Sequence, residues 1–217
     1  MDKNITFEGS LLIASKSMPD PRFSKSVILL INFSSDGAMG IVLNRPHKIN
    51  LKDVLKDMNI SQISSNTYIP IFNGGPVSID KGFLLHNSDI ILEDSIEING
   101  ANCFLNSSKD SLSSLCMEEI NSGVNLYLGC CGWSPGQLEN ELKSNDWIIS
   151  NADENLIFDD NYNDMWKVGL LIAHSNIGML CAPMLLLTKP MTIPRQDFPQ
   201  GITTASESIV GLRNLRH

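Results

Sequence analysis

An apolar run that ends in a glycine-rich turn constrains the fold of this chain more than any other segment. Residues 124–131 are almost wholly apolar, which is typical of a central strand buried on both faces of a sheet. A turn of Gly, Trp, Ser, Pro and Gly follows at residues 132–136. The spacing of Ser134 and Gln137 predicts a capping box, with Ser134 as the N-cap and Pro135 as the first helical residue. A buried strand is therefore expected to turn directly into a helix.

The rest of the chain has the pattern of short strands and a few helices. Strands are expected at residues 10–15, 26–33, 39–43, 68–72, 82–86, 95–98, 102–105 and 124–131, and helices at 51–58, 108–120, from 134 and at 163–173. Asp36-Gly37 is a hairpin turn between the second and third of these strands. Because strands outnumber helices and are mostly joined by hairpins, we expect an α+β fold.

Composition limits the functional class. A chain of 217 residues with 42% apolar content can bury a sizeable core. Its formal net charge of −8 disfavours general binding to nucleic acid or anionic membranes. No apolar run reaches the roughly 20 residues that cross a bilayer, and no signal peptide is expected at the first residues. The five cysteines are odd in number and lack zinc-type spacing, so we expect reduced thiols and a cytoplasmic protein.

Charge and proline content separate a body from a tail. Residues 181–217 hold four of the ten prolines, and their basic residues exceed their acidic residues by two. Prolines at such spacing prevent a long helix. We expect one domain over residues 1–180 and a Pro-containing, net-basic tail over 181–217. A lineage-specific extension, a partner-binding segment and an altered reading frame would each account for the tail.

Three polar turns are candidates for a ligand-binding site. Asn44-Arg45 follows a strand, where Arg45 could clamp a carboxylate or phosphate or could simply pair with an acidic neighbour. Gly74-Gly75 could present backbone amides to an anion, or could form a tight turn. His86 ends a strand, where it could act as a general base or be a hydrogen-bonded structural residue. No companion nucleophile or orienting carboxylate can be assigned to it from the spacing.

Other reactive side chains have structural interpretations. Ser134 lies between a strand and a helix, but the Gly-x-Ser-x-Gly pattern of a nucleophile elbow is missing and Pro135 lacks an amide N–H. Cys130 and Cys131 are neighbours in a strand and face opposite ways, which favours core packing over redox chemistry. The acidic residues between 153 and 164 lack the spacing of a calcium loop. No catalytic residue, metal or cofactor is therefore expected.

Several motifs occur in a fixed order between residues 7 and 180. They are the segments at 9–14, 18–27 and 37–46, Gly74-Gly75-Pro76-Val77, Gly82-Phe83-x-Leu85-His86, Gly132-Trp133-x-Pro135-Gly136-Gln137-Leu138-Glu139-x-Glu141, Trp147, Ile157-Phe158 and Trp166. In this order they resemble the YqgE/AlgH family of bacterial proteins. Two features depart from the family pattern: the Cys130-Cys131 pair and the tail.

The resemblance implies a single-domain α+β fold with a mostly antiparallel, bifurcated sheet that closes into a barrel-like core, flanked by a few helices. It implies no established activity. One branch of the family is associated with transcriptional control of exopolysaccharide synthesis, but the family has no recognisable DNA-reading motif. The resemblance therefore assigns no catalytic residue.

Three functions follow as hypotheses. We favour a non-enzymatic cytoplasmic protein that binds a protein partner or a small ligand, with a regulatory outcome. The alternative is an enzyme or metabolite sensor with a pocket where Asn44-Arg45, Gly74-Gly75 and His86 converge. Direct DNA binding has little support in an acidic chain without a helix-turn-helix pattern, so any role in transcription is expected to be indirect.

Overall fold

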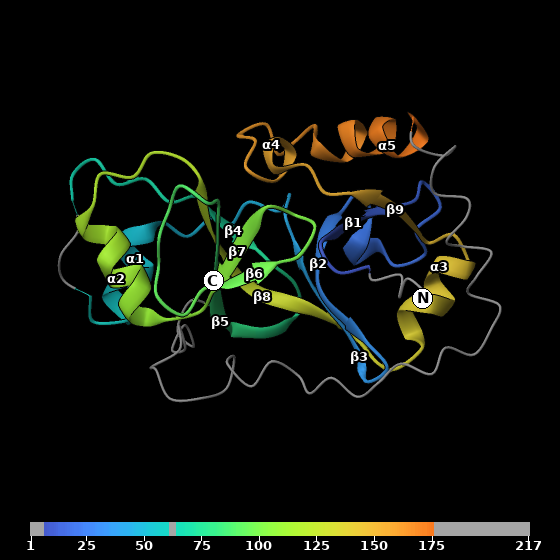
Figure 1. The fold of residues 1–217 in the computed structure, drawn as a ribbon, viewed down its shortest axis with the longest axis horizontal. Helices are drawn as coiled ribbons and strands as arrows, with labels where there is room; N and C mark the ends of the chain where they lie inside the picture. Colours follow the sequence, from blue (N-terminus) through green and yellow to red (C-terminus); the bar gives the residue numbers. More distant parts are fainter. Residues whose placement is uncertain (1–6, 61–63, 176–217) are drawn as a thin grey trace, which may run out of the picture.

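The apolar run near residue 128 is the central strand of a curled, mostly antiparallel sheet (Figure 1). A computed structural model describes residues 7–60 and 64–175 of the chain. In it, β8 (Val124–Trp133) runs antiparallel to β3 (Gly37–Val42) and β5 (Val77–His86) and parallel to β4 (Ile71–Asn73). Every residue of β8 except Gly132 is buried. The expectation of a central strand covered on both faces is confirmed.

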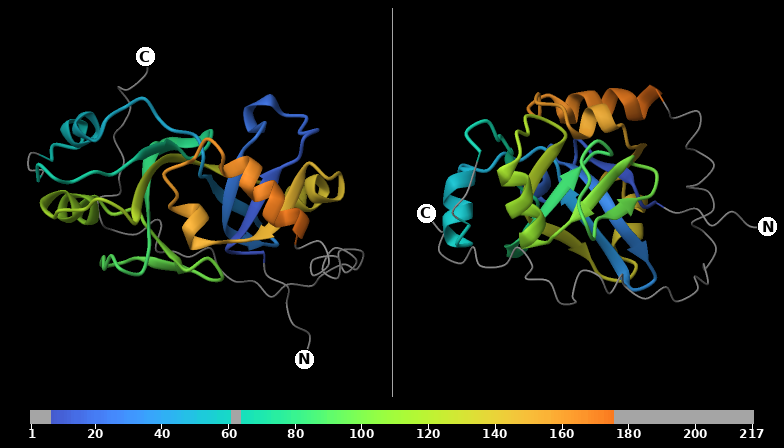
Figure 2. Two further views of the ribbon diagram at one scale, coloured as in Figure 1. Left: turned by 90° about the horizontal axis from the view of Figure 1, so that it is seen from above. Right: turned by 60° about the vertical axis from the view of Figure 1, so that its left-hand side comes forward.

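The remaining strands extend the sheet in two directions from β8. Beyond β3 lie β2 (Val27–Ser34), β1 (Ser10–Ala14) and β9 (Trp147–Asn151), and beyond β5 lie β7 (Cys103–Asn106) and β6 (Ile96–Ile98). All of these neighbours pair antiparallel. The sheet curls into a half-barrel, which Figure 2 shows from two further directions. The predicted α+β fold, with a mostly antiparallel, bifurcated sheet and a barrel-like core, is confirmed.

The sheet branches at Gly129, in the middle of β8. Residues before it pair with β4, and residues after it pair with β3. Gly74 fills the branch point, because its amide donates to the Leu128 carbonyl (2.7 Å) and its carbonyl accepts from the Val42 amide (2.8 Å). A Cβ on Gly74 would lie 2.2 Å from the Gly129 carbonyl oxygen, and one on Gly129 would lie 2.5 Å from that of Gly75. The backbones of the Gly74-Gly75 turn and of β8 approach each other here so closely that neither has room for a side chain.

Apolar side chains form three clusters around this sheet. Along β1 and β2, alternate residues face opposite sides, so that Leu11 and Leu29 join one cluster while Leu12 and Leu30 join another. The first cluster is covered by α4 (Glu154–Ile157) and α5 (Met165–Ser175), and the second includes two residues of α3 (Gln137–Lys143). A third cluster lies at the far end of the sheet beneath α1 (Leu51–Asp57) and α2 (Lys109–Met117). Figure 1 shows these helices at three separate places around the sheet.

Helices α1 and α2 begin within one residue of the starts predicted by the ranges 51–58 and 108–120, and a side chain caps each. The Asn50 side chain accepts a hydrogen bond from the Asp53 amide (3.0 Å) at the start of α1, and the Ser108 hydroxyl accepts from the Ser111 amide (3.4 Å) at the start of α2. Each cap satisfies an amide that has no partner within the helix.

The predicted cap of α3 is wrong. The helix begins at Gln137, and the preceding Gly136 has a φ of +75°, a left-handed conformation that a helix cannot continue through. Ser134 therefore lies one turn outside the helix and its hydroxyl makes no capping bond. The reciprocal half of the capping box does form, since the Gln137 side-chain oxygen accepts from the Ser134 amide (3.0 Å).

Other boundaries differ in ways that tertiary contacts explain. Strand β9 and the short helix α4 were not predicted, because both are short and neither shows an apolar alternation or a helical period by itself. Helix α2 ends at Met117, three residues before its predicted end. The predicted tail at 181–217 lies outside the described residues. Within the described ranges, no helix combines the length and the apolar content that crossing a membrane requires.

The branch point leads to a test by substitution. Gly75→Ala would place a Cβ 2.3 Å from the Cys130 carbonyl group, at a residue whose φ is +150°. Gly132→Ala would place a Cβ whose nearest neighbour, the Val77 side chain, is 4.0 Å away. We expect Gly75→Ala to lower the free energy of unfolding by about 3 kcal/mol or more, because it combines overpacking with backbone strain. Gly132→Ala should change it by less than about 0.5 kcal/mol. Urea unfolding measures both, and equal effects would show that the close approach is not required.

Candidate functional site: a cleft with two tryptophans

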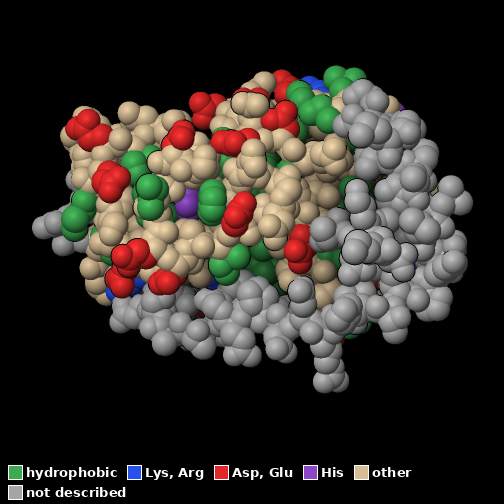
Figure 3. Space-filling model, in the orientation of Figure 1, with side chains coloured by type: hydrophobic (Ala, Val, Ile, Leu, Met, Phe, Trp, Pro, Cys, Tyr) green, Lys and Arg blue, Asp and Glu red, His purple; other side chains and the backbone are tan. Residues whose placement is uncertain are grey.

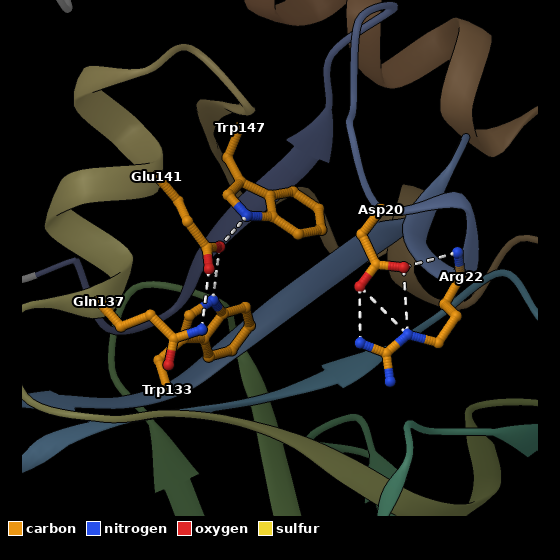
Figure 4. A network of polar contacts seen from close by, with 6 residues as sticks. All are labelled: Asp20, Arg22, Trp133, Gln137, Glu141 and Trp147. Atoms are coloured by element: carbon orange, nitrogen blue, oxygen red, sulfur yellow. Dashed lines mark hydrogen bonds and ion pairs between the residues drawn. The ribbon is translucent and has the colours of Figure 1, made fainter.

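Three side chains converge on the carboxylate of Glu141 beyond the end of the central strand (Figure 4). Trp133 is the last residue of β8, Gln137 the first of α3 and Trp147 the first of β9. Both indole N–H groups donate to Glu141 Oε2, at 2.8 Å from Trp133 and 2.7 Å from Trp147. The Gln137 amide donates to Oε1 at 2.9 Å. One carboxylate thus joins the ends of two strands to a helix.

Packing explains why these groups meet. Trp147 pairs with Ala14 across the sheet, and its ring meets Trp133 edge to face at a centroid distance of 6.2 Å. Phe23 packs on Trp147 in the same manner at 5.8 Å. Trp133 and Trp147 are only 7% and 4% exposed. A buried indole N–H requires an acceptor, and Glu141 supplies one to both rings.

The opposite wall is the segment around η1, a single turn of 3₁₀ helix (Pro21–Phe23). The Asp20 carboxylate accepts from the backbone amide of Arg22 (2.9 Å), and from its guanidinium through Nε (3.1 Å) and Nη2 (2.7 Å). These hydrogen bonds hold the pKa of Asp20 below its ordinary value. The Arg22 guanidinium also lies over the Phe23 ring, 5.8 Å from its centroid.

A cleft of about 300 Å³ lies between the two walls. Its lining consists of Met18, Pro19, Asp20, Arg22, Phe23, Pro76, Val77, Cys131, Gly132, Trp133, Gln137, Glu141, Asp146 and Trp147. Aromatic, proline and aliphatic surface surrounds a few fixed polar groups, and this mixture is typical of small-molecule sites, although the volume is at the lower end of their range.

Two wider hollows occur elsewhere on the described surface. One, of about 490 Å³, lies between residues 100–102 and 151–155, and the other, of about 550 Å³, lies beside α1 and includes Tyr68 and Tyr162. Neither contains a polar network comparable to that around Glu141. We therefore take the cleft as the candidate site.

Asn44 and Arg45 do not line the cleft, but their side chains bond to residues 24–27, which follow Phe23 of its wall. The Asn44 side chain accepts from the Val27 amide (3.0 Å) and donates to the Lys25 carbonyl (2.9 Å). Arg45 donates to the Ser24 carbonyl and to the Ser26 hydroxyl. Both side chains thus fix the turn that follows the Phe23 wall, and their hydrogen-bond partners are backbone and hydroxyl groups of this chain.

Gly74 and Gly75 lie next to Asn44 and Arg45. The Asn73 amide donates to the Arg45 carbonyl (2.7 Å), so that the two predicted turns are brought together. The Gly75 backbone is packed against Cys130 and leads directly into Pro76 and Val77, which line the cleft. The glycines therefore shape the cleft through close backbone packing.

His86 lies apart from the other predicted residues. It pairs with Val124, whereas Gly75 contacts Cys130, and six residues of a strand span about 20 Å. His86 is 1% exposed and stacks on Phe104. Its Nδ1 lies 2.9 Å from the Asn87 carbonyl, which can only accept, so Nδ1 carries the proton.

The other ring nitrogen of His86 completes a buried network. Nε2 lies 2.8 Å from the Ser95 hydroxyl, which also accepts from the Asn106 side-chain amide at 3.2 Å. With its proton on Nδ1, a neutral imidazole accepts from the Ser95 hydroxyl at Nε2. Burial lowers the pKa of His86 and favours the same neutral form.

Thiols and acidic residues have structural surroundings. The four described cysteines are free and buried, and burial raises the pKa of Cys131, on the cleft wall, to about 12. In the acidic loop, Asp153 caps α4 and Asp164 pairs with Lys167. Among the described residues, no grouping of three or more His, Cys, Asp or Glu side chains could hold a metal ion.

Comparison with known proteins identifies the family. The family model described as AlgH-like matches residues 11–176. The chain belongs to the AlgH-like family. A UPF0301 protein of Xylella fastidiosa strain M23 is 39% identical over 164 residues, which cover 75% of this chain and 87% of that protein. A UPF0301 protein of Vibrio cholerae is 39% identical over 161 residues, covering 72% and 86%.

Solved structures show the same fold. The solution structure of the AlgH protein from Pseudomonas aeruginosa superposes with a TM-score of 0.68 at 29% identity, covering 89% of this chain and 99% of that one. A crystal structure of a Corynebacterium diphtheriae protein gives a TM-score of 0.60 at 20% identity, covering 87% and 95%, and supports the fold alone. The predicted membership of a bacterial YqgE/AlgH family is confirmed.

The sequence marks the residues around Glu141 as family motifs, and Gln137 also as the partner in the predicted capping box. Trp133, Gln137, Glu141 and Trp147 were quoted for the resemblance, and none was proposed as part of a site. The local signal is the four-residue spacing of Gln137 and Glu141, which puts both side chains on one helix face. Nothing in the spacing shows that two tryptophans meet the same carboxylate.

The shared carboxylate can be tested by an isosteric change. Glu141→Gln keeps the shape but replaces one acceptor oxygen with an amide donor, which opposes either an indole N–H or the Gln137 amide. We expect the free energy of unfolding to fall by about 2 kcal/mol, as for hydrogen bonds to a charged group. The matched control is Glu139→Gln on the same helix, which should cost less than about 0.5 kcal/mol. Equal losses would contradict the role of Glu141.

The neutral state of His86 predicts a pH dependence. A histidine whose pKa is lower in the folded state binds fewer protons there than in the unfolded chain, so stability falls as the pH drops below about 6.5. Between pH 7.5 and 5, His86→Gln should lose less stability than the unmodified protein. Unfolding in urea at a series of pH values measures this. An identical pH slope in both proteins would show that His86 does not titrate differently on folding.

Proposed function

We propose that this AlgH-like protein is a non-enzymatic, cytoplasmic binding protein and that the cleft beside Glu141 receives its ligand. The observation that supports this is the convergence of Trp133, Trp147 and Gln137 on one carboxylate at the edge of a 300 Å³ hollow. Such an arrangement fixes the shape of a site before a ligand arrives, which reduces the entropy lost on binding.

Binding accounts for the site better than catalysis does. The described lining contains no serine or histidine, and its thiol, Cys131, is buried with a pKa raised to about 12. A nucleophile with an adjacent base is the arrangement that covalent catalysis requires. A regulatory outcome, including an indirect effect on transcription, would follow if occupancy of the cleft changed the affinity for a partner protein.

Intrinsic fluorescence provides a direct test. The chain has three tryptophans, and Trp166 packs in a different apolar cluster from the two in the cleft, with its indole bonded to the Ala14 carbonyl (2.8 Å). In a Trp166→Phe background, emission therefore reports Trp133 and Trp147. Titration with nucleotides, amino acids, amines, organic acids and divalent cations should identify a compound that changes this emission and raises the Tm.

A blocking variant connects that signal with the cleft. Gly132 lines the cleft, is exposed, and has only the Val77 side chain within 4.0 Å of an added Cβ. Gly132→Leu should weaken binding by about 10-fold or more by filling the hollow, while Gly132→Ala should change it little. Binding that survives Gly132→Leu would move the site elsewhere. Chemical conversion of the bound compound by the protein would contradict the non-enzymatic assignment and show that the protein is an enzyme.

A further inference from the structure

From the hydrogen-bond donors and charges of the cleft, we infer that its ligand is an organic ammonium ion, either a free amine or the side chain of a lysine on a partner. This inference rests on the proposed binding function and adds the chemical class of the ligand. It depends on which donors and acceptors the lining leaves available.

Several donors on the lining are already engaged. The indole N–H groups of Trp133 and Trp147 and the amide N–H₂ of Gln137 all point at Glu141. The Nε and Nη2 of Arg22 both donate to Asp20. Figure 4 shows both sets of donors directed at carboxylates of the chain itself. Arg22 keeps its remaining guanidinium N–H groups, so an anionic ligand would meet Arg22 alone and would be repelled by the carboxylates of Glu141 and Asp146 on the same lining.

Acceptors remain in excess on the same lining. Asp20, Glu141 and Asp146 carry three formal negative charges against the single positive charge of Arg22. Arg22 and Asp20 form an ion pair at 2.7 Å, so Glu141 and Asp146 give the cleft its net charge. Coulomb attraction between groups a few Å apart at a partly buried site therefore favours a cationic ligand.

Asp146 is the acceptor in the best position to meet that ligand. Its backbone is fixed, because its amide donates to the Glu141 carbonyl (3.0 Å) and its carbonyl accepts from Ser15 (2.9 Å). Its side chain is half-buried and makes no hydrogen bond or ion pair with any residue that the structure describes. Trp147, the next residue, lines the same cleft.

Aromatic surface adds a second attraction for a cation. The π faces of tryptophan and phenylalanine carry negative potential, and an ammonium group within about 6 Å of a ring is attracted to it. The wall already provides one such contact within the chain, since Arg22 lies over Phe23. An alkyl ammonium could place its methylene groups against Pro19, Pro76 and Val77 while its charged end reaches Asp146.

The charge on the rest of the protein surface also favours a cationic ligand over an anionic one. The chain carries a net charge of −8. Figure 3 shows acidic side chains spread over the face that carries α2, β6 and β7, with few Lys or Arg side chains among them. A general acidic surface would also attract amines without specificity, so the experiment has to separate the cleft from the surface.

The test uses the Trp166→Phe protein and four probes of similar size at low ionic strength. Tetramethylammonium and cadaverine are free cations, neopentyl alcohol is a neutral analogue and hexanoate is an anion. We expect the cations to change the cleft emission with dissociation constants at least about 10-fold lower than those of the other two. Nα-acetyl-lysine amide forms a second arm: tighter binding than cadaverine would indicate a partner lysine, and weaker binding a free amine.

Two matched variants locate the charge that selects the ligand. Asp146→Asn should weaken cation binding by about 5-fold or more, whereas Asp110→Asn, an exposed change on α2, should leave it unaltered. Cation binding that persists in both Asp146→Asn and Gly132→Leu would be surface attraction and would overturn the inference. Hexanoate or alcohol binding that Gly132→Leu abolishes would overturn the ammonium assignment and leave the binding function standing. If no compound of any class gives a signal that Gly132→Leu removes, both proposals fail.

Discussion

The contact between the Gly74-Gly75 turn and β8 at Gly129 determines the arrangement of everything around it. At this point β8 leaves its parallel neighbour β4 and begins to pair with β3. Each backbone lies where the Cβ of the other would be, so the branch can form only between glycines. The second half of β8 then carries Trp133 to the edge of the cleft, and the turn carries Pro76 and Val77 to the same place.

Glu141 has a comparable role at the end of β8. Burying two indoles is favourable by several kcal/mol, but each buried N–H requires an acceptor. A single carboxylate provides enough lone pairs for both rings and for Gln137, and an amide in its place would oppose one donor with another. The same arrangement sets the chemistry of the cleft, because donors that point at Glu141 are turned away from a ligand.

The sequence predicts those parts of the fold that local chemistry determines. The hairpin at Asp36-Gly37, the start of α1 at Leu51 and the buried run of β8 all follow from residues adjacent in the chain, and all are present. The cap at Ser134 was mispredicted because Gly136 adopts a left-handed conformation that composition alone does not reveal. Strand β9 has no period of its own and exists because β1 offers it an edge.

The candidate site was harder to predict because tertiary packing assembles it. Residues 133, 141 and 147 come from three separate elements, and only the folded sheet brings them within hydrogen-bond distance. Asp20 lies on the other wall of the same cleft. The residues proposed from the sequence mark the supports of the cleft more than its lining. Asn44 and Arg45 hold the turn behind Phe23, and Gly75 precedes Pro76.

His86 belongs to the other side of the branch, where β5, β6 and β7 meet. Its hydrogen bonds with Asn87 and Ser95 satisfy both ring nitrogens in a buried network. The branch at Gly129 therefore divides the described molecule into two regions with different demands. Beyond β5, the polar groups of this network are paired with one another. Beyond β3, the two indole N–H groups are paired with Glu141, while Asp146 lines the cleft with no partner for its carboxylate among the described residues. This unpaired carboxylate at the cleft is the feature that supports the proposed binding function.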